Sequence, residues 1–373
     1  MDDEELPKIS IIVPAKDEEA VIARCLDALL GVDYPRTKIE IIVVEGKSND
    51  ATGDVCLEFA KKHPNILRVV YEDTPRGKPS ALNLGLISAT GEIVGVFDAD
   101  SVPKRDVLRR VASHFREPSV MALQGNPCSL NEKGNILTKV AARERKAWFQ
   151  TLLKGRKERN LFVPLTGSGQ FVRRKILIEM GGWPDSLAED VELALKLVEN
   201  NHNVTYADDI CFWQETPSTL RSLINQRARW YRGYMEAAIK YGRLLKKPSW
   251  RTIDGEVLLF GPYMMVLCLI SYLNWLLNVL MPNQAVNPFL NPAAFATMLT
   301  AVTLLLIGVS LVFMDKPISL KNILWMPFIY FYWVLQVAIA GWALLQIAFR
   351  RPKVWKKTDK CGAVTADFDL EDK

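Results

Sequence analysis

The sequence has little of several residue types that commonly carry catalysis. There are only three histidines among the 373 residues, and none lies in a motif typical of a catalytic base. The six cysteines are scattered, and no two form a C-x-x-C pair, which argues against a zinc site or a redox pair. Scattered thiols are typical of a reducing compartment. A carboxylate is therefore the better candidate for a general base.

Long basic blocks are also absent. The formal charge of +5 is modest, so we expect no nucleic-acid partner, and the basic residues fit a face near anionic lipid. Four of the first five residues are acidic, and this stretch lacks an apolar core, so we expect no signal peptide. Charged residues are frequent up to Glu256 and almost vanish between residues 257 and 349. This division predicts a polar part followed by an apolar part.

The polar part alternates short apolar runs with amphipathic stretches. The pattern predicts strands at residues 9–13, 40–44, 67–71 and 93–97, and helices at 21–30, 51–62 and 80–89. Such alternation is typical of an α/β fold with a mostly parallel sheet covered on both faces. Ligands bind such sheets at the carboxyl ends of the strands, where Glu45, Asp98 and Asp100 fall.

Two carboxylates, Asp98 and Asp100, directly follow the fourth predicted strand. They could share a hard divalent cation with the oxygens of a diphosphate. The alternative is a helix start, with Ser101 as the cap and Pro103 in the first turn. The buried strand that runs straight into Asp98 favours the metal.

A basic, glycine-containing turn with Lys78 enters the helix that carries Asn83. Basic and glycine residues at a helix N-terminus can bind an anion. An ordinary polar turn is equally compatible with this pattern, so both interpretations stay open here.

A second pair of acids, Glu189 and Asp190, begins another predicted helix. Both could simply complement the helix dipole. The same dipole lowers the pKa of a carboxylate, so a role as general base requires burial to raise that pKa.

Cations and aromatic residues are dense between residues 226 and 233, immediately before the apolar part. Helical spacing places Gln226, Arg229 and Trp230 near one face, together with Gly233. A helix at the membrane surface has the same composition, and that alternative also stays open.

Taken together, these motifs resemble glycosyltransferase family 2. The resemblance is specifically to its membrane-bound branch, which includes cellulose, chitin and hyaluronan synthases and ceramide glucosyltransferases. It covers residues 9–233 and continues in the basic stretch at 350–358. It implies a GT-A fold, a Rossmann-like domain that binds a nucleotide sugar. It also implies Mg²⁺ or Mn²⁺ as cofactor and inversion at the anomeric carbon.

The resemblance also implies roles for individual residues. Asp98 and Asp100 match the family's metal motif, and Asp190 matches its catalytic base. Glu189 and Trp230 are expected to bind the acceptor. The residues expected to bind the nucleotide sugar are Pro14, Ala15, Asp17, Glu45, Lys78, Asn83, Asp98, Gln226 and Arg229.

Two positions depart from the family's pattern. Gly46 follows Glu45 where the family often has a second acid, which weakens the expectation of a uridine nucleotide. Ala188 replaces the hydroxyl residue that usually precedes the acid pair. Because both acids of the pair are present, the assignment of Asp190 is retained.

Three apolar runs, at 257–281, 292–314 and 323–349, are each long enough to cross a bilayer. We expect a cytosolic catalytic domain at 1–220, interfacial helices at 221–255, transmembrane or re-entrant helices at 256–350, and a basic-then-acidic tail at 351–373. Three crossings would place the basic tail outside, against the positive-inside rule. The run at 257–281 is the first candidate for a segment that does not cross, because Gly261-Pro262 interrupts it and residues 226–243 before it already suggest an interfacial region.

The sequence thus predicts a multi-pass enzyme of the cell membrane with a cytoplasmic catalytic domain. It would move a sugar from a nucleotide-diphosphate sugar, expected to be a UDP-sugar, to a growing polysaccharide. Transfer of one sugar to a lipid acceptor is the alternative, because synthases that extrude a polymer usually carry additional spans before the catalytic domain. A non-catalytic membrane scaffold is disfavoured, since it would not need metal ligands, a base and a cation together. Homo-oligomerisation stays open.

Overall fold

The computed structural model describes residues 3–241, 249–280, 324–353 and 357–366, together with residues 298, 302, 305, 306 and 309. The chain divides into two compact units. The first unit consists of Met1–Ser218, Leu244–Gly255 and Asp359–Lys373, and the second of Thr219–Arg243 and Glu256–Thr358.

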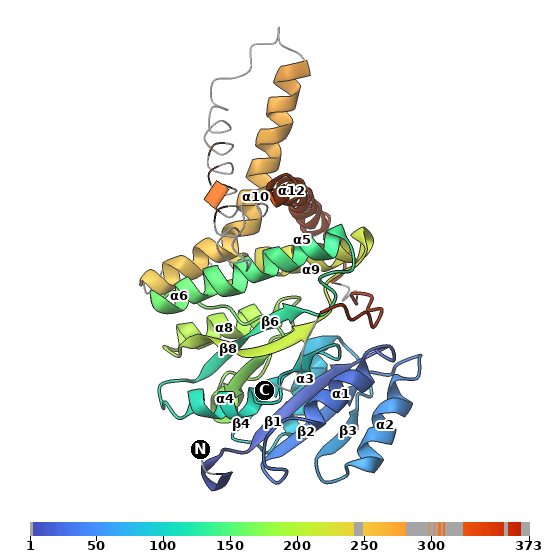
Figure 1. Cartoon of the computed structure of the whole chain (residues 1–373). Coiled ribbons are helices and arrows are strands. Elements are labelled where there is room, and N and C mark those ends of the chain that lie inside the picture. Colours follow the sequence, from blue (N-terminus) through green and yellow to red (C-terminus); the bar gives the residue numbers. More distant parts are fainter. Residues whose placement is uncertain are drawn as a thin grey trace. The chain divides into compact units, whose positions relative to one another are not determined.

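The first unit is built on an eight-stranded sheet with the order β3-β2-β1-β4-β7-β6-β8-β5 (Figure 1). Its first four strands in sequence are β1 (Ile9–Ala15), β2 (Ile39–Glu45), β3 (Leu67–Tyr71) and β4 (Ile93–Val96), and they pair in parallel. Strands β1, β2 and β4 are buried almost throughout, as expected for Ile- and Val-rich strands covered on both faces. The four predicted strands are thereby confirmed.

The other half of the sheet is mixed. It contains β5 (Val102–Pro103), β6 (Ala122–Ser129), β7 (Gln170–Arg173) and β8 (Val204–Gln214). Strand β7 runs antiparallel to both β4 and β6, β5 runs antiparallel to β8, and β6 and β8 are parallel. None of these four strands was predicted from the sequence; β7, for example, is short and carries no uninterrupted apolar run.

Helices pack against the sheet and close the core. Helix α3 approaches β1 so closely that a Cβ atom at Gly85 would lie 2.6 Å from the side chain of Ile12, so only glycine fits at that contact. The helical elements of this unit are η1 (Asp3–Glu5), α1 (Ile22–Leu30), α2 (Thr52–Lys62), α3 (Lys78–Ser88), α4 (Val107–Phe115), α5 (Ile136–Ala147), the π-helix η2 (Trp148–Leu153), α6 (Lys154–Glu158), α7 (Arg174–Glu179) and α8 (Glu189–Glu199).

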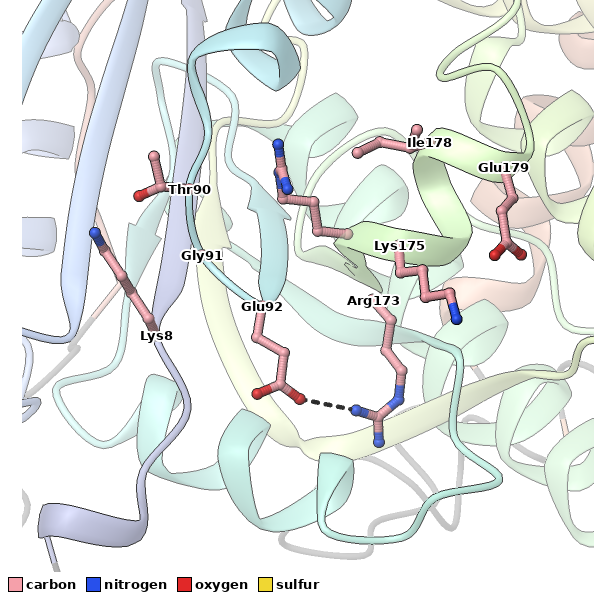
Figure 2. A pocket seen from close by; sticks show the side chains of 9 residues that line it. Lys8, Thr90, Gly91, Glu92, Arg173, Lys175, Ile178 and Glu179 are labelled. Carbon is pink, nitrogen blue, oxygen red and sulfur yellow. Dashed lines mark hydrogen bonds and ion pairs between the residues drawn. The ribbon is translucent and has the colours of Figure 1, made fainter.

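A surface pocket lies at the amino end of β4, lined among others by Lys8, Glu92, Arg173 and Lys175 (Figure 2). The side chains of Glu92 and Arg173 point toward one another, and Arg173 Nη1 donates to Glu92 Oε1 over 3.1 Å. Parallel strands bind ligands at their carboxyl ends. This pocket is at the opposite end of β4 from Asp98, so it is not a candidate for the chemistry at the strand ends.

The second unit contains helices α9 (Leu220–Tyr241) and α12 (Met326–Ala348) and most of α10 (Trp250–Leu280). Helix α9 packs on α12 through a cluster that includes Met235 and Ala340. Polar contacts join the same two helices, since Tyr231 Oη donates to Gln336 Oε1 over 2.9 Å.

Two helical segments, Trp250–Asn274 and Met326–Ala348, are long and apolar enough to cross a membrane, and each contains an 18-residue stretch with a mean hydropathy of 1.8. They overlap the apolar runs predicted at 257–281 and 323–349, and Pro262 lies within the first segment. The run predicted at 292–314 lies outside the described residues except for a few isolated positions.

Candidate active site

Asp98 and Asp100 lie two and four residues beyond Val96, the last residue of β4. The alternative of a helix cap at Ser101 is wrong. Residues 102 and 103 form β5, and the next helix, α4, begins only after Asp106. The two carboxylates therefore lie at the carboxyl end of a parallel strand, where ligands of such sheets bind.

The carboxylate of Asp98 is held on both oxygens. Its Oδ1 accepts a hydrogen bond from Lys78 Nζ at 2.6 Å, and its Oδ2 accepts one from Gln214 Nε2 at 3.2 Å. The hydroxyl of Ser168 accepts the backbone N–H of Asp98 at 3.1 Å. About a third of the Asp98 side chain, 35%, is exposed, so this carboxylate is fixed in place and still open to a ligand.

Asp100 is almost fully buried, with 2% of its surface exposed. Its Oδ2 accepts the backbone N–H of Glu215 at 3.0 Å and also contacts the ammonium group of Lys360. Burial raises the pKa of Asp100, but the charge and hydrogen bond of Lys360 outweigh it, and the pKa lies below its ordinary value. Asp100 is therefore ionised at neutral pH.

Lys78 is the first residue of α3, following Gly77, which adopts a positive φ of 106°. Its Nζ lies 2.9 Å from the carbonyl oxygen of Gly167 and 3.9 Å from Glu189 Oε1, in addition to its bond with Asp98. Burial lowers the pKa of Lys78, but the nearby carboxylates outweigh it and raise that pKa. The side chain is therefore a fixed cation within a cluster of acids.

Asp190 is the second residue of α8. Its Oδ1 accepts the backbone N–H of Val191 at 2.7 Å. Burial raises the pKa of Asp190 to about 6, against the lowering effects of the Lys78 charge and the Val191 hydrogen bond. The burial that a general base at a helix start requires is thus present, and Asp190 is mostly ionised at pH 7 yet able to accept a proton.

A loop at residues 166–169 lies between these groups, and the sequence analysis did not single it out. Gly167 has a positive φ of 75°, and a Cβ atom there would lie 3.0 Å from Lys78 Nζ and 3.1 Å from Asp190 Oδ2. The absence of a side chain at Gly167 therefore leaves room for both the cation and the base next to the same backbone position. In the sequence, the two glycines that flank Ser168, Gly167 and Gly169, were the pattern that could have indicated this loop.

The nucleotide-binding residues predicted on β1 and β2 lie side by side, because Ala15 pairs in register with Glu45. Glu45 is buried and accepts backbone N–H groups of Ser48 at 2.6 Å and Lys47 at 3.1 Å. Asp17 accepts the backbone N–H of Asn49 at 2.7 Å. These two acids therefore order the loop after β2. Pro14 lies at the end of β1.

Asn83 uses both ends of its amide to hold one turn. Its Oδ1 accepts the backbone N–H of Trp183 at 2.9 Å, and its Nδ2 donates to the carbonyl of the same residue at 2.8 Å. The side chain thus ties α3 to the chain that leads into α8, and so links the elements that carry Lys78 and Asp190.

Gln226, Arg229 and Trp230 lie on α9, in the second unit. Gln226 is buried, while 37% of the Trp230 surface is exposed. The guanidinium carbon of Arg227 lies 4.3 Å from the centroid of the Trp230 ring, a cation–π contact. One face of Trp230 is therefore covered by Arg227.

The structure thus brings Lys78, Asp98, Glu189 and Asp190 together from the ends of β4, α3 and α8 in the first unit. Asp100, two residues further on, is held by Lys360 and Glu215, and neither of these was predicted. They are separated from Asp100 by 260 and 115 residues, and no local pattern marks such long-range partners.

The mixed sheet, with paired carboxylates at a strand end and an acid at a helix start, defines an α/β domain of the kind that binds ligands at the carboxyl ends of its strands. The chain belongs to glycosyltransferase family 2: the family model described as "Glycosyltransferase like family 2" matches residues 7–233. The predicted family is confirmed.

Two curated relatives illustrate the range of the family. The chain is 34% identical over 250 residues to the beta-monoglucosyldiacylglycerol synthase of Trichormus variabilis, covering 65% of this chain and 52% of that protein. It is 26% identical over 375 residues to the poly-beta-1,6-N-acetyl-D-glucosamine synthase of Staphylococcus epidermidis, covering 94% and 87%. The chain spans about half the length of the first curated relatives it matches.

The fold is also shared with a solved structure, a mannosyltransferase of Pyrobaculum calidifontis in complex with GDP-Man and Mn²⁺. The TM-score is 0.60 at 24% identity, and the match covers 94% of this chain and 90% of that chain. The predicted GT-A fold is thereby confirmed.

Proposed function

We propose that this protein is an inverting glycosyltransferase that moves a sugar from a nucleotide-diphosphate sugar to an acceptor hydroxyl. The observation that carries the proposal is Asp190, an ionised carboxylate whose pKa is raised to about 6. It lies beside the fixed cation Lys78, which in turn binds the strand-end carboxylate of Asp98. A base next to an ordered site for a charged leaving group is the arrangement that glycosyl transfer needs.

Asp98 and Asp100 would hold Mg²⁺ or Mn²⁺. Their donor chemistry fits this role, because such ions are commonly bound by one or two carboxylates while substrate phosphates and waters complete the shell. Both carboxylates are already matched by cations, Lys78 and Lys360, so this position favours positive charge. When bound, the ion would neutralise charge on the diphosphate leaving group. The Mn²⁺ of the mannosyltransferase with this fold supports the assignment.

Asp190 would act as the general base. As the acceptor oxygen bonds to the anomeric carbon, its proton passes to the Asp190 carboxylate. The bond from that carbon to the diphosphate oxygen breaks, and its electron pair leaves with the nucleotide diphosphate. Attack opposite the leaving group inverts the anomeric centre. Lys78 supplies fixed positive charge where negative charge develops, and Arg229 is proposed to add to it.

The remaining predicted contacts divide between donor and acceptor. We assign Gln226 to the donor and Glu189 and Trp230 to the acceptor. Pro14, Ala15, Asp17 and Glu45 would line the nucleotide, at the joined ends of β1 and β2. Asn83 would act by holding the turn before α8.

For the acceptor we propose a growing polysaccharide, supported by the match along most of the poly-beta-1,6-N-acetyl-D-glucosamine synthase. The second candidate is a lipid acceptor, favoured by the higher identity to beta-monoglucosyldiacylglycerol synthase. A UDP-sugar is the proposed donor.

We further propose a location in the cell membrane with a cytoplasmic catalytic domain. The two apolar helical segments, Trp250–Asn274 and Met326–Ala348, support the membrane location. The division into a catalytic domain at 1–220, interfacial helices at 221–255, membrane helices at 256–350 and a tail at 351–373 belongs to the same proposal.

The test is to incubate membranes containing the protein with labelled UDP-glucose, UDP-N-acetylglucosamine or GDP-mannose and to size the product. A ladder or high polymer would identify a polysaccharide synthase, and a single organic-soluble species would identify a lipid acceptor. Membranes containing the Asp190→Asn protein are the matched control. If no donor gives product above that control, the proposal is wrong.

A further inference from the structure

The tail segment, defined here as residues 359–366, lies within the first unit and reaches the proposed metal site. Lys360 contacts Asp100 Oδ2, and its Nζ also lies 3.3 Å from the carbonyl oxygen of Glu215. The Lys360 side chain is only 15% exposed and that of Asp100 3%. Lys360, which lies 260 residues after Asp100 in the sequence, thus contacts the buried carboxylate that we propose as a ligand of the divalent cation.

Glu215 anchors the tail segment next to this contact. The buried Glu215 carboxylate accepts the backbone N–H of Cys361 at 3.0 Å through Oε2, and Arg24 Nη2 at 3.1 Å through Oε1. Arg24 Nη1 also donates to the carbonyl of Gly362 at 3.0 Å. One arginine therefore bridges the anchor and the tail segment.

The backbone of the tail segment also makes close contacts beyond the Glu215 anchor. Gly362 has a positive φ of 72°, and a Cβ atom there would lie 3.1 Å from the carbonyl oxygen of Ala20. Further along, the backbone N–H groups of Thr365 and Ala366 both donate to the carbonyl of Leu130 at 2.8 Å. These contacts place Lys360 at Asp100 by a defined docking geometry and not by a chance surface encounter.

We propose that Lys360 is a built-in competitor of the divalent cation: its ammonium group occupies Asp100, and binding of the cation displaces Lys360 and loosens the tail segment. This inference rests on the proposed metal site. Asp100 Oδ2 already accepts the Glu215 N–H, and the ammonium group and the divalent ion would both have to bind the same buried carboxylate. The two cations repel each other at that distance, and the site therefore holds one or the other.

The competition predicts an effect on cation affinity. If Lys360 contacts Asp100 in about nine of ten molecules, only about one molecule in ten is free to bind Mn²⁺. Because the apparent affinity scales with this free fraction, removing Lys360 should tighten Mn²⁺ binding about tenfold. Loss of one partner of a buried ion pair also leaves the other charge uncompensated, which acts in the same direction. Lys360→Arg keeps the cation and should bind Mn²⁺ like wild type.

The first experiment titrates Mn²⁺ into the full chain in detergent and follows free Mn²⁺ by electron paramagnetic resonance. The variants are Lys360→Met, Lys360→Arg, Asp100→Asn and, as matched control in the same stretch, Lys357→Met. We expect tighter binding only for Lys360→Met and loss of binding for Asp100→Asn.

A second measurement needs no variant and so does not depend on the folding of Lys360→Met. Trypsin must take the Lys360 side chain into its own specificity pocket to cut after that residue. Release of the fragment that begins at Cys361, followed by mass spectrometry, should therefore accelerate severalfold in Mn²⁺ relative to EDTA. Cleavage after other exposed lysines is the internal reference.

The outcomes separate the two proposals. If Asp100→Asn loses Mn²⁺ but Lys360→Met binds it like wild type, or if Mn²⁺ leaves cleavage after Lys360 unchanged, the competitor is disproved and the metal site stands. If Asp100→Asn binds Mn²⁺ as well as wild type does, the proposed metal site fails and the competitor fails with it.

Discussion

The two units of this protein use polar groups in opposite ways. In the first unit, charged side chains gather at the carboxyl ends of strands and are matched by opposite charges, as Lys78 is by Asp98 and Glu189. In the second unit, a hydrogen bond from Tyr231 to Gln336 joins α9, which is rich in cations, to the apolar helix α12. The first arrangement keeps ionised groups ready for a charged ligand, whereas the second satisfies hydrogen bonds in apolar surroundings.

The difference has an energetic consequence. A buried ion pair costs several kcal/mol when only one partner is removed, because the remaining charge stays buried. A hydrogen bond between helices in an apolar environment is worth about 1 kcal/mol. Removing Lys78 from its buried ion pairs in the first unit should therefore cost more stability than removing the Tyr231–Gln336 hydrogen bond in the second unit.

The largest effect is expected for Asp100→Asn in the first unit. Removing one of two carboxylate ligands should abolish Mn²⁺ binding and lower sugar transfer about a thousandfold, because a bound ion contributes several kcal/mol to stabilising leaving-group charge. The measurement is initial-rate transfer at saturating Mn²⁺. Asp106→Asn, which alters a surface ion pair with Arg110, is the control and should retain activity. Equal rates for Asp100→Asn and wild type would contradict the metal site.

Lys78→Met should cause the largest loss of stability. The Lys78 side chain is 11% exposed and balances several carboxylates, so its removal should destabilise the first unit by about 3–5 kcal/mol. Denaturant unfolding of the purified protein measures this change. Arg76 lies two residues before Lys78 and its side chain is exposed, so Arg76→Met should change stability little. If both variants unfold like wild type, the charge of Lys78 does not stabilise the carboxylates around it.

The pH dependence of transfer should reveal Asp190. Its pKa is raised to about 6, and only the ionised form can accept the acceptor's proton. Activity should therefore be high above this pKa and fall about tenfold for each pH unit below it. The measurement is kcat/KM between pH 5 and pH 8 with the cation saturating. A rate that rises toward low pH would show that the ionised carboxylate is not the active form.

The smallest effect is expected in the second unit. Gln336 is 1% exposed and accepts the Tyr231 hydroxyl, so Gln336→Leu should lower stability by about 1 kcal/mol. Thermal unfolding in detergent measures the change, with Gln346→Leu on the same helix as control. A loss as large as that of Lys78→Met would remove the contrast between the two units.

Much of the fold could be predicted because it depends on local patterns. Strand β3 coincides with the predicted run at 67–71, and β1, β2 and β4 differ from theirs by no more than two residues at an end. Strands β1, β2 and β4 are mostly apolar runs that are buried almost throughout, whereas only Leu67 of β3 is buried. The antiparallel strand β7 could not be predicted, since its four residues, Gln170–Arg173, carry no distinctive periodicity.

The candidate site shows the same division. Asp98 and Asp190 could be located because each follows or begins a recognisable element. The raised pKa of Asp190 could not be predicted, because it depends on burial by the folded chain. Lys360 could not be predicted either, since its contact with Asp100 joins residues 260 positions apart.

The central claim is that Asp190 is the base of an inverting sugar transfer. The most direct test compares donor binding and transfer for wild type and Asp190→Asn, because this change keeps the shape of the side chain and removes its basicity. The account predicts unchanged affinity for the nucleotide sugar and a loss of turnover of about a thousandfold. Near-wild-type turnover of the Asp190→Asn protein would contradict it.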